Sequence, residues 1–157
     1  MDTDEILVFI GSATFAGWAT VRWYGRLLAA ELPYCSATPS VRLTLAVLPV
    51  ALLTALAWAL QVGAAREVRD DLTYTLLFLA LGATWLALSV KATTWLGIDF
   101  WDDALERNNL AACVAVCGAL VANSVVFTFA NLGEGPTIWT TIGPAVLGAV
   151  PSFSQAS

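Results

Sequence analysis

The chain has 157 residues, of which 59% are hydrophobic and only 12% are charged, and its formal net charge is −5. A soluble domain of this size cannot bury so much apolar surface, because small proteins leave a large share of their surface exposed. A lipid bilayer is itself an apolar solvent, so it is the first partner that we expect. The acidic balance excludes the basic surface that binding of nucleic acid requires.

The sequence contains no histidine. This excludes histidine-ligated haem, the common zinc sites and catalysis by a histidine base. No nucleotide-binding loop or catalytic motif is found in their place. We therefore expect no enzymatic activity, no metal and no other cofactor.

Four long apolar runs predict helices that cross the membrane, since a spanning helix needs about 20 mostly apolar residues. The expected helices are residues 6–23, 41–62, 72–95 and 110–132, with a shorter fifth over residues 137–150. The predicted fold is an all-α, polytopic transmembrane bundle that forms one integral membrane domain over residues 1–157. The acidic stretch from Met1 to Glu5 differs from the basic start of a secretory signal peptide, so the first run is expected to be retained.

The basic residues are divided unequally between the two expected sides of the bilayer. If all five helices span, one side receives Arg66 and Arg69, and the other receives Arg22, Arg26, Arg42, Lys91 and Arg107. The positive-inside rule places the richer side in the cytoplasm. The chain is therefore expected in the cell (inner) membrane with its N-terminus outside.

Tryptophan, tyrosine and lysine side chains support the same assignment of the cytoplasmic (inner) membrane interface. Trp23, Tyr24 and Trp101 are expected there, because their rings are apolar while their polar edges need water or headgroups. Lys91 is expected to extend its long stem to the same level.

Pro49 lies inside the second apolar run. Proline has no amide hydrogen, so the carbonyl four residues before it loses its usual partner. A membrane helix tolerates this where a neighbouring group satisfies the freed carbonyl. We expect a kink at this position.

The fourth run carries a stripe of small residues at helical spacing. Such residues let two helix backbones approach closely, which is how membrane helices gain packing energy. The stripe predicts a helix-packing face, within the subunit or between subunits, formed by Ala111, Ala115, Gly118, Ala119 and Ala122.

A weakly polar stripe lies on another side of the same run. It holds Ser124 and Thr128 beside Cys113 and Cys117, and we interpret the two cysteines as packing residues. Asn123 lies near the expected mid-membrane level, where its amide is expected to bond to a neighbouring helix. A polar intramembrane site at Asn123, Ser124 and Thr128, lining a pore or binding a substrate, is the alternative.

Acidic residues precede two of the expected helices. Asp70 and Asp71 stand before the third run, and Asp99, Asp102, Asp103 and Glu106 lie in an expected interfacial loop before the fourth. Carboxylates at a helix start oppose the positive end of the helix dipole and can cap it. Ligation of a divalent cation by paired acids is the alternative for the second group.

The segments from Asp102 to Ala112 and from Asn131 to Pro136, with the apolar run between them, resemble an uncharacterised family of bacterial inner-membrane proteins typified by YjfL. In that family the pattern acid-x-x-x-Glu-Arg-x-Asn-x-Ala-Ala precedes a small-residue helix, and Asn-hydrophobic-Gly-x-Gly-Pro ends it. The resemblance is best over residues 99–139. It implies a helical inner-membrane protein without an assigned activity, with motif positions at Asp102, Asp103, Glu106, Arg107, Asn109, Asn131, Gly133, Gly135 and Pro136.

Two functions fit these features. The first is a non-catalytic integral membrane protein that acts as an assembling subunit of a homo-oligomer or of a larger membrane complex. The alternative is a small ion channel or transporter, with the weakly polar stripe along its path and Asp102 and Asp103 as an acidic ring.

Overall fold

The structure, a computed structural model, describes residues 3–29, 38–95, 97 and 99–132. These residues form an all-α bundle and contain no β-strand, which confirms the predicted fold class. The helical segments are α1 (Thr3–Ala29), α2 (Pro39–Gly63), α3 (Arg66–Asp70), α4 (Leu72–Trp95), η1 (Phe100–Glu106) and α5 (Leu110–Ala130). The expected fifth helix, residues 137–150, lies outside the described residues.

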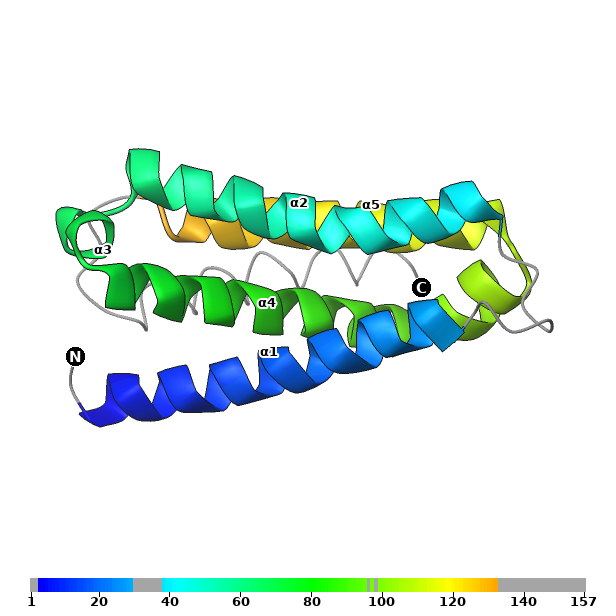
Figure 1. The fold of residues 1–157 in the computed structure, drawn as a ribbon. Coiled ribbons are helices and arrows are strands. Elements are labelled where there is room, and N and C mark those ends of the chain that lie inside the picture. The colour runs from blue at the N-terminus through cyan, green and yellow to red at the C-terminus, as the bar shows by residue number, and fades with distance from the viewer. Residues whose placement is uncertain (1–2, 30–37, 96, 98, 133–157) are drawn as a thin grey trace.

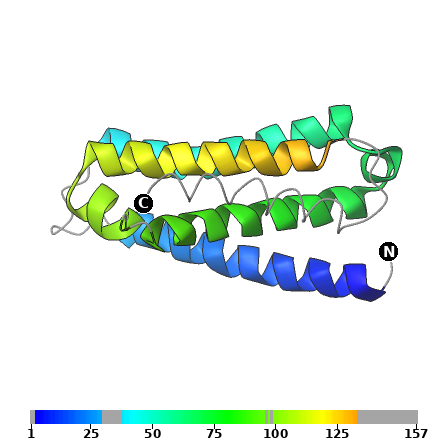
Figure 2. The same cartoon turned by 180° about the vertical axis from the view of Figure 1, so that it is seen from behind.

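The four long helices lie side by side and alternate in direction along the chain (Figures 1 and 2). α1 and α4 run one way, and α2 and α5 run the other way. α1 lies at the edge of the bundle and packs mainly against α4, whereas α2, α4 and α5 all pack against one another. We call the end that holds α3 the α3 end and the opposite end, where α1 and α4 finish, the η1 end.

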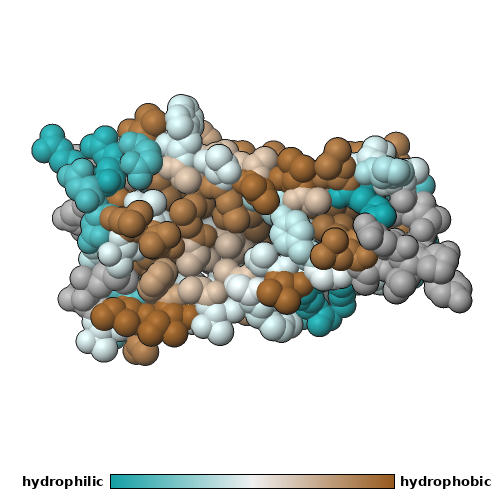
Figure 3. Space-filling model, in the orientation of Figure 1, coloured by the Kyte–Doolittle hydropathy of each residue, from teal (hydrophilic) through white to brown (hydrophobic). Residues whose placement is uncertain are grey.

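Each of the four long helices is long and apolar enough to cross a membrane. Large apolar side chains cover their outer faces, among them Val21 and Trp58, whose exposed fractions are 75% and 70%. Figure 3 shows this apolar surface between polar patches at the two ends of the bundle. Since a soluble monomer rarely exposes an apolar surface of this extent, the chain is an integral membrane protein.

The helix boundaries follow the apolar runs closely, and two of the differences have a simple cause. α4 covers residues 72–95 as predicted, whereas α1 extends beyond the predicted residues 6–23 at both ends. Asp4 and Glu5 in its first turn and Arg26 in its last turn oppose the helix dipole, which favours helix beyond the apolar core. α2 begins at Pro39, whose fixed φ suits a first helical turn.

The charged turn expected between the second and third runs forms the short helix α3. Asp71 follows it, and its carboxylate accepts the backbone N–H of Thr73 at 2.8 Å in the first turn of α4. This confirms the predicted capping role for Asp71, whereas Asp70 is the last residue of α3. Hydrogen bonds from the backbone and side chain of Thr73 hold the pKa of Asp71 below its usual value.

α1 packs against α4 through small residues in its middle. Ser12 and Ala16, four residues apart, are both buried, and the Thr84 hydroxyl of α4 donates to the Ser12 carbonyl at 3.0 Å. Nearer the α3 end, the Tyr74 hydroxyl donates to Glu5 at 3.0 Å. Close backbone approach through small residues is thus used at the α1–α4 contact.

Gly82 of α4 lies where three helices meet. A Cβ atom built there would overlap a methyl group of Leu56 in α2 and would lie 3.4 Å from the Phe127 ring of α5. Leu56 and Phe127 are themselves buried, so neither can move aside without repacking. The absence of a side chain at position 82 therefore sets how closely α2, α4 and α5 approach.

Replacing Gly82 with alanine is expected to destabilise the bundle by about 1–3 kcal/mol, because the added methyl group overfills this junction. Gly17→Ala is the matched control, since a Cβ at Gly17 would meet no atom within 4 Å. Thermal unfolding in detergent would measure both variants. Equal unfolding temperatures for the two would contradict the packing role of Gly82.

The carbonyl that Pro49 leaves without a partner is satisfied from α1. Pro49 lies inside α2, so the carbonyl four residues before it belongs to Leu45. The indole N–H of Trp23 donates to the Leu45 carbonyl at 3.2 Å, and the Tyr24 hydroxyl donates to the adjacent Ala46 carbonyl at 2.8 Å. The condition under which a membrane helix tolerates an internal proline is thus met, and the expected kink stays a prediction.

The same contacts correct the expected role of two aromatic residues. The polar edges of Trp23 and Tyr24 were expected to reach water or headgroups, but they bond to the backbone of α2. An unpaired carbonyl is costly in an apolar layer, where no water can bond to it, so a nearby side-chain donor is favoured there. Trp23 also stacks on Phe100 of η1, with ring centroids 4.0 Å apart and planes inclined by 10°.

A double-mutant cycle tests this joint. Trp23→Phe should cost about 1–2 kcal/mol, because it leaves the Leu45 carbonyl without a donor while keeping an aromatic ring on Phe100. In a Pro49→Ala background the same change should cost much less, since the amide of residue 49 can then donate to Leu45. Unfolding free energies in detergent would give the coupling. An identical cost in both backgrounds would show that the indole bond does not compensate the proline.

Candidate functional site

A pocket of about 390 Å³ lies between α1, α2 and α4, and it extends from the middle of the bundle toward the η1 end. Its inner wall is apolar and includes Phe15, Leu53, Leu86 and Leu120. Pro49 lines it too, so the joint between α1 and α2 forms part of the wall. A pocket of this size and lining is typical of sites that hold a small apolar or amphipathic molecule.

Three cationic side chains line the same pocket near the η1 end: Arg22 and Arg26 from α1, and Lys91 from α4. Two of them lie over aromatic rings. The Arg22 guanidinium is 5.5 Å from the centre of the Trp18 ring, and that of Arg26 is 5.4 Å from the centre of the Trp101 ring. Within the described residues, none of the three cations forms an ion pair with a carboxylate.

One carboxylate, Asp99, also lines the pocket. It accepts the backbone N–H groups of Trp101 at 2.8 Å and Asp102 at 3.3 Å, so it is occupied as the N-cap of η1. Three cations against one carboxylate leave the pocket with a net positive charge, in a chain whose overall charge is −5.

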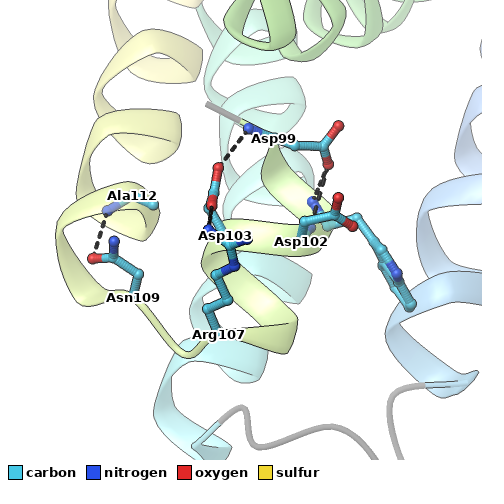
Figure 4. A network of polar contacts seen from close by, with 7 residues as sticks. Asp99, Asp102, Asp103, Arg107, Asn109 and Ala112 are labelled. Carbon is cyan, nitrogen blue, oxygen red and sulfur yellow. Dashed lines mark hydrogen bonds and ion pairs between the residues drawn. The ribbon is translucent and has the colours of Figure 1, made fainter. Parts of the chain in front are cut away.

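The acidic segment before α5 is a folded elbow (Figure 4). The segment was expected to be a loop, but η1 forms a wide helical turn in which the Arg107 N–H donates to the Asp102 carbonyl, five residues back, at 3.0 Å. Asp103 bonds to the Asp99 N–H at 3.0 Å and to the Arg107 guanidinium at 3.3 Å. Backbone amides left free by a wide turn are thus satisfied by neighbouring carboxylates.

The expected capping of the fourth long helix by the acids is wrong, because an amide holds that position. Asn109 accepts the N–H groups of Ala111 at 3.0 Å and Ala112 at 3.4 Å and so caps α5, whereas Asp99 caps η1. The adjacent Asn108, at φ 49°, accepts the Thr38 N–H at 3.1 Å and so joins the elbow to the start of α2. Within the described part of the chain, no group of three metal-ligating side chains occurs.

The predicted helix-packing face of α5 points away from the other described helices. Ala111, Ala115, Gly118 and Ala122 are exposed and Ala119 is half-buried. The inward face of α5 carries larger residues, namely Cys113, Val116, Leu120 and Phe127. Packing of the stripe inside the subunit is therefore not seen among the described residues, and packing between subunits stays a prediction.

The weakly polar stripe is turned into the bundle. Cys113 is buried and Cys117 is half-buried, which agrees with their interpretation as packing residues. Ser124 and Thr128 are half-buried. The buried Asn123 donates to the Ala119 carbonyl of its own helix at 2.9 Å, and the expected bond to a neighbouring helix is not found among the described residues.

Some of the remaining motif positions lie within the described residues, and others lie outside them. Asn131 ends α5, is buried and donates to the Phe127 carbonyl. Asp102 and Glu106 lie in η1, and Arg107 pairs with Asp103. Gly133, Gly135 and Pro136 lie outside the described residues.

The pocket is not predicted from the sequence. Arg22 was expected only to indicate the orientation of the chain, and Lys91 was expected in addition to extend its stem to the interface. The usable signal was the spacing of Trp18 and Arg22, because residues four apart share one helix face and place a cation beside a ring. Which helix would form the opposite wall could not be read from that spacing.

None of the family models, curated proteins and solved structures compared with the chain matches it. The resemblance to the YjfL family therefore stays a prediction.

Asn109→Ala should destabilise the chain by about 0.5–2 kcal/mol, the usual cost of losing an N-cap. Asn109→Asp should restore most of that stability, because the carboxylate keeps the acceptor and adds a favourable interaction with the helix dipole. Thermal unfolding of both variants would measure the effect. If the aspartate variant were as unstable as the alanine variant, the capping role would be excluded.

Proposed function

We propose that this integral membrane protein is a non-catalytic subunit of a homo-oligomer, and that the small-residue stripe of α5 is the contact surface between copies. The observation that carries the proposal is the exposure of the stripe: Ala115, Gly118 and Ala122 face outward, and the space beside Gly118 is open. Exposed valines such as Val114 and Val121 flank the stripe. Small residues beside larger ones form a groove into which a second helix can pack.

A lipid tail fills such a groove less well than a facing helix does, because tails are mobile and a helix presents fixed side chains and backbone. Association of membrane helices depends on this packing, since the hydrophobic effect gives no advantage between lipid and protein. The same stripe can instead receive a different membrane subunit of a larger complex.

We further propose the cell (inner) membrane, with the N-terminus outside. The support is the fold's placement of Arg22, Arg26, Arg42, Lys91 and Arg107 at the η1 end, against Arg66 and Arg69 at the α3 end. The positive-inside rule assigns the richer end to the cytoplasm.

The described residues offer little support for the alternative of a channel or transporter. The Asn123 amide is bonded to its own helix, and Asp103 is paired with Arg107. Neither Ser124 nor Thr128 lines the pocket between α1, α2 and α4.

Gly118→Leu should weaken self-association about tenfold or more, which corresponds to about 1.4 kcal/mol, because the added side chain fills the groove. Its fold should be unchanged, since the site is open in the single chain. Gly17→Leu is the matched control: Gly17 is also open and exposed, but it lies on α1. Light scattering and native electrophoresis of the purified chains would measure the copy number. A wild-type chain that is monomeric in bilayer nanodiscs, or a Gly118→Leu chain that assembles as the wild type does, would overturn the proposal.

A further inference from the structure

The pocket between α1, α2 and α4 combines two features that are found together in few kinds of site. One part is apolar and lies toward the middle of the bundle, and the other part carries cations toward the η1 end. We propose that this pocket binds one anionic lipid of the surrounding bilayer, with a tail between the helices and the phosphate at Arg22 and Lys91.

The charge of the pocket selects an anion. Arg22, Arg26 and Lys91 lack a carboxylate partner among the described residues, while Asp99 already accepts two backbone N–H groups. A cation at the edge of an apolar layer gains from a counter-ion, because water there screens charge less than bulk water does. Basic pockets between membrane helices are a known kind of site for lipid headgroups.

The shape of the pocket selects a molecule with a tail. On α1 the lining runs from Phe15 to Arg26, which is about 16 Å at 1.5 Å per helical residue. A free phosphate ion would occupy only the basic end and would leave the apolar wall of Leu53 and Leu86 uncovered. A lipid fills both parts at once, so it gains both the apolar contact and the charge contact.

The pocket is also accessible from the membrane. Trp18 lines it with an exposed fraction of 54%, and Arg22 and Lys91 are exposed. α1 lies at the edge of the bundle (Figure 2), so a lipid reaches the pocket from the bilayer without opening the core. The proposal rests on the membrane location of the chain and does not require assembly through α5.

Native mass spectrometry of the purified full chain, stripped of lipid in a neutral detergent, tests the proposal. Phosphatidylglycerol and phosphatidylcholine with the same tails are the probes. We expect one phosphatidylglycerol retained per chain, at least tenfold more tightly than phosphatidylcholine. Millimolar inorganic phosphate or glycerol phosphate should not displace it. Equal retention of the two lipids, or displacement by phosphate alone, would overturn the proposal.

Two variants locate the site, and one is its matched control. Arg22→Gln with Lys91→Gln should weaken phosphatidylglycerol retention at least tenfold. Arg66→Gln with Arg69→Gln removes the same charge at the α3 end and should leave retention unchanged. Equal losses in the two double variants would show that binding follows only the overall charge, which would contradict a site.

Ala87→Phe tests the apolar part separately. Ala87 lines the pocket and is half-buried, so a phenyl group there should displace the tail while every cation remains. Loss of retention in this variant, with its unfolding temperature unchanged, is expected. Full retention would place the lipid elsewhere. Because retention is counted per chain, it is expected to be the same in Gly118→Leu whether or not the copies separate.

Discussion

Backbone groups of a membrane helix must form their hydrogen bonds within the protein, because no water is available in the bilayer core. The rest of this structure depends on how that requirement is met at Pro49. The proline removes the donor to the Leu45 carbonyl, and the Trp23 indole of α1 replaces it. Trp23 is held in turn by its stack on Phe100 in η1. One side chain thus joins α1, α2 and the elbow, which are far apart in the sequence.

This joint also explains why a pocket exists where it does. α1 is attached to α2 near the η1 end by Trp23 and Tyr24, and to α4 in its middle by Ser12 and Ala16. The pocket lies along the segment of α1 that includes Trp23 and Tyr24, and Pro49 forms part of its wall. The interaction that compensates the proline therefore lies beside a surface on which cations and apolar residues meet.

The sequence predicts the parts of this fold that depend on local physics. Helix α4 is predicted over residues 72–95, because an apolar run in lipid must satisfy its backbone within itself. The need for a donor to the Leu45 carbonyl follows from the missing proline N–H in the same way. The identity of that donor does not follow, because Trp23 could be assigned to the interface as readily as to a neighbouring helix.

Which helix faces contact one another is the part of the fold that the sequence predicts least well. Small residues at helical spacing occur in α1 and in α5, and the spacing alone favoured the stripe around Gly118. Among the described helices, the structure buries Ser12 and Ala16 of α1, and Gly82 of α4 lies where α2, α4 and α5 meet. Which of several similar faces meets a neighbour depends on how all the helices pack together, and a pattern within one helix does not contain that information.

The central claim, that an indole from α1 satisfies the carbonyl freed by Pro49, has a direct spectroscopic test. A ¹³C=¹⁸O label placed at the Leu45 carbonyl gives an isolated infrared band whose frequency reports its hydrogen bonding in a bilayer. The band should lie at the frequency of a bonded carbonyl in the unaltered chain and should move to higher frequency in Trp23→Phe. A band at the unbonded frequency in the unaltered chain, or one that does not move in the variant, would contradict the account.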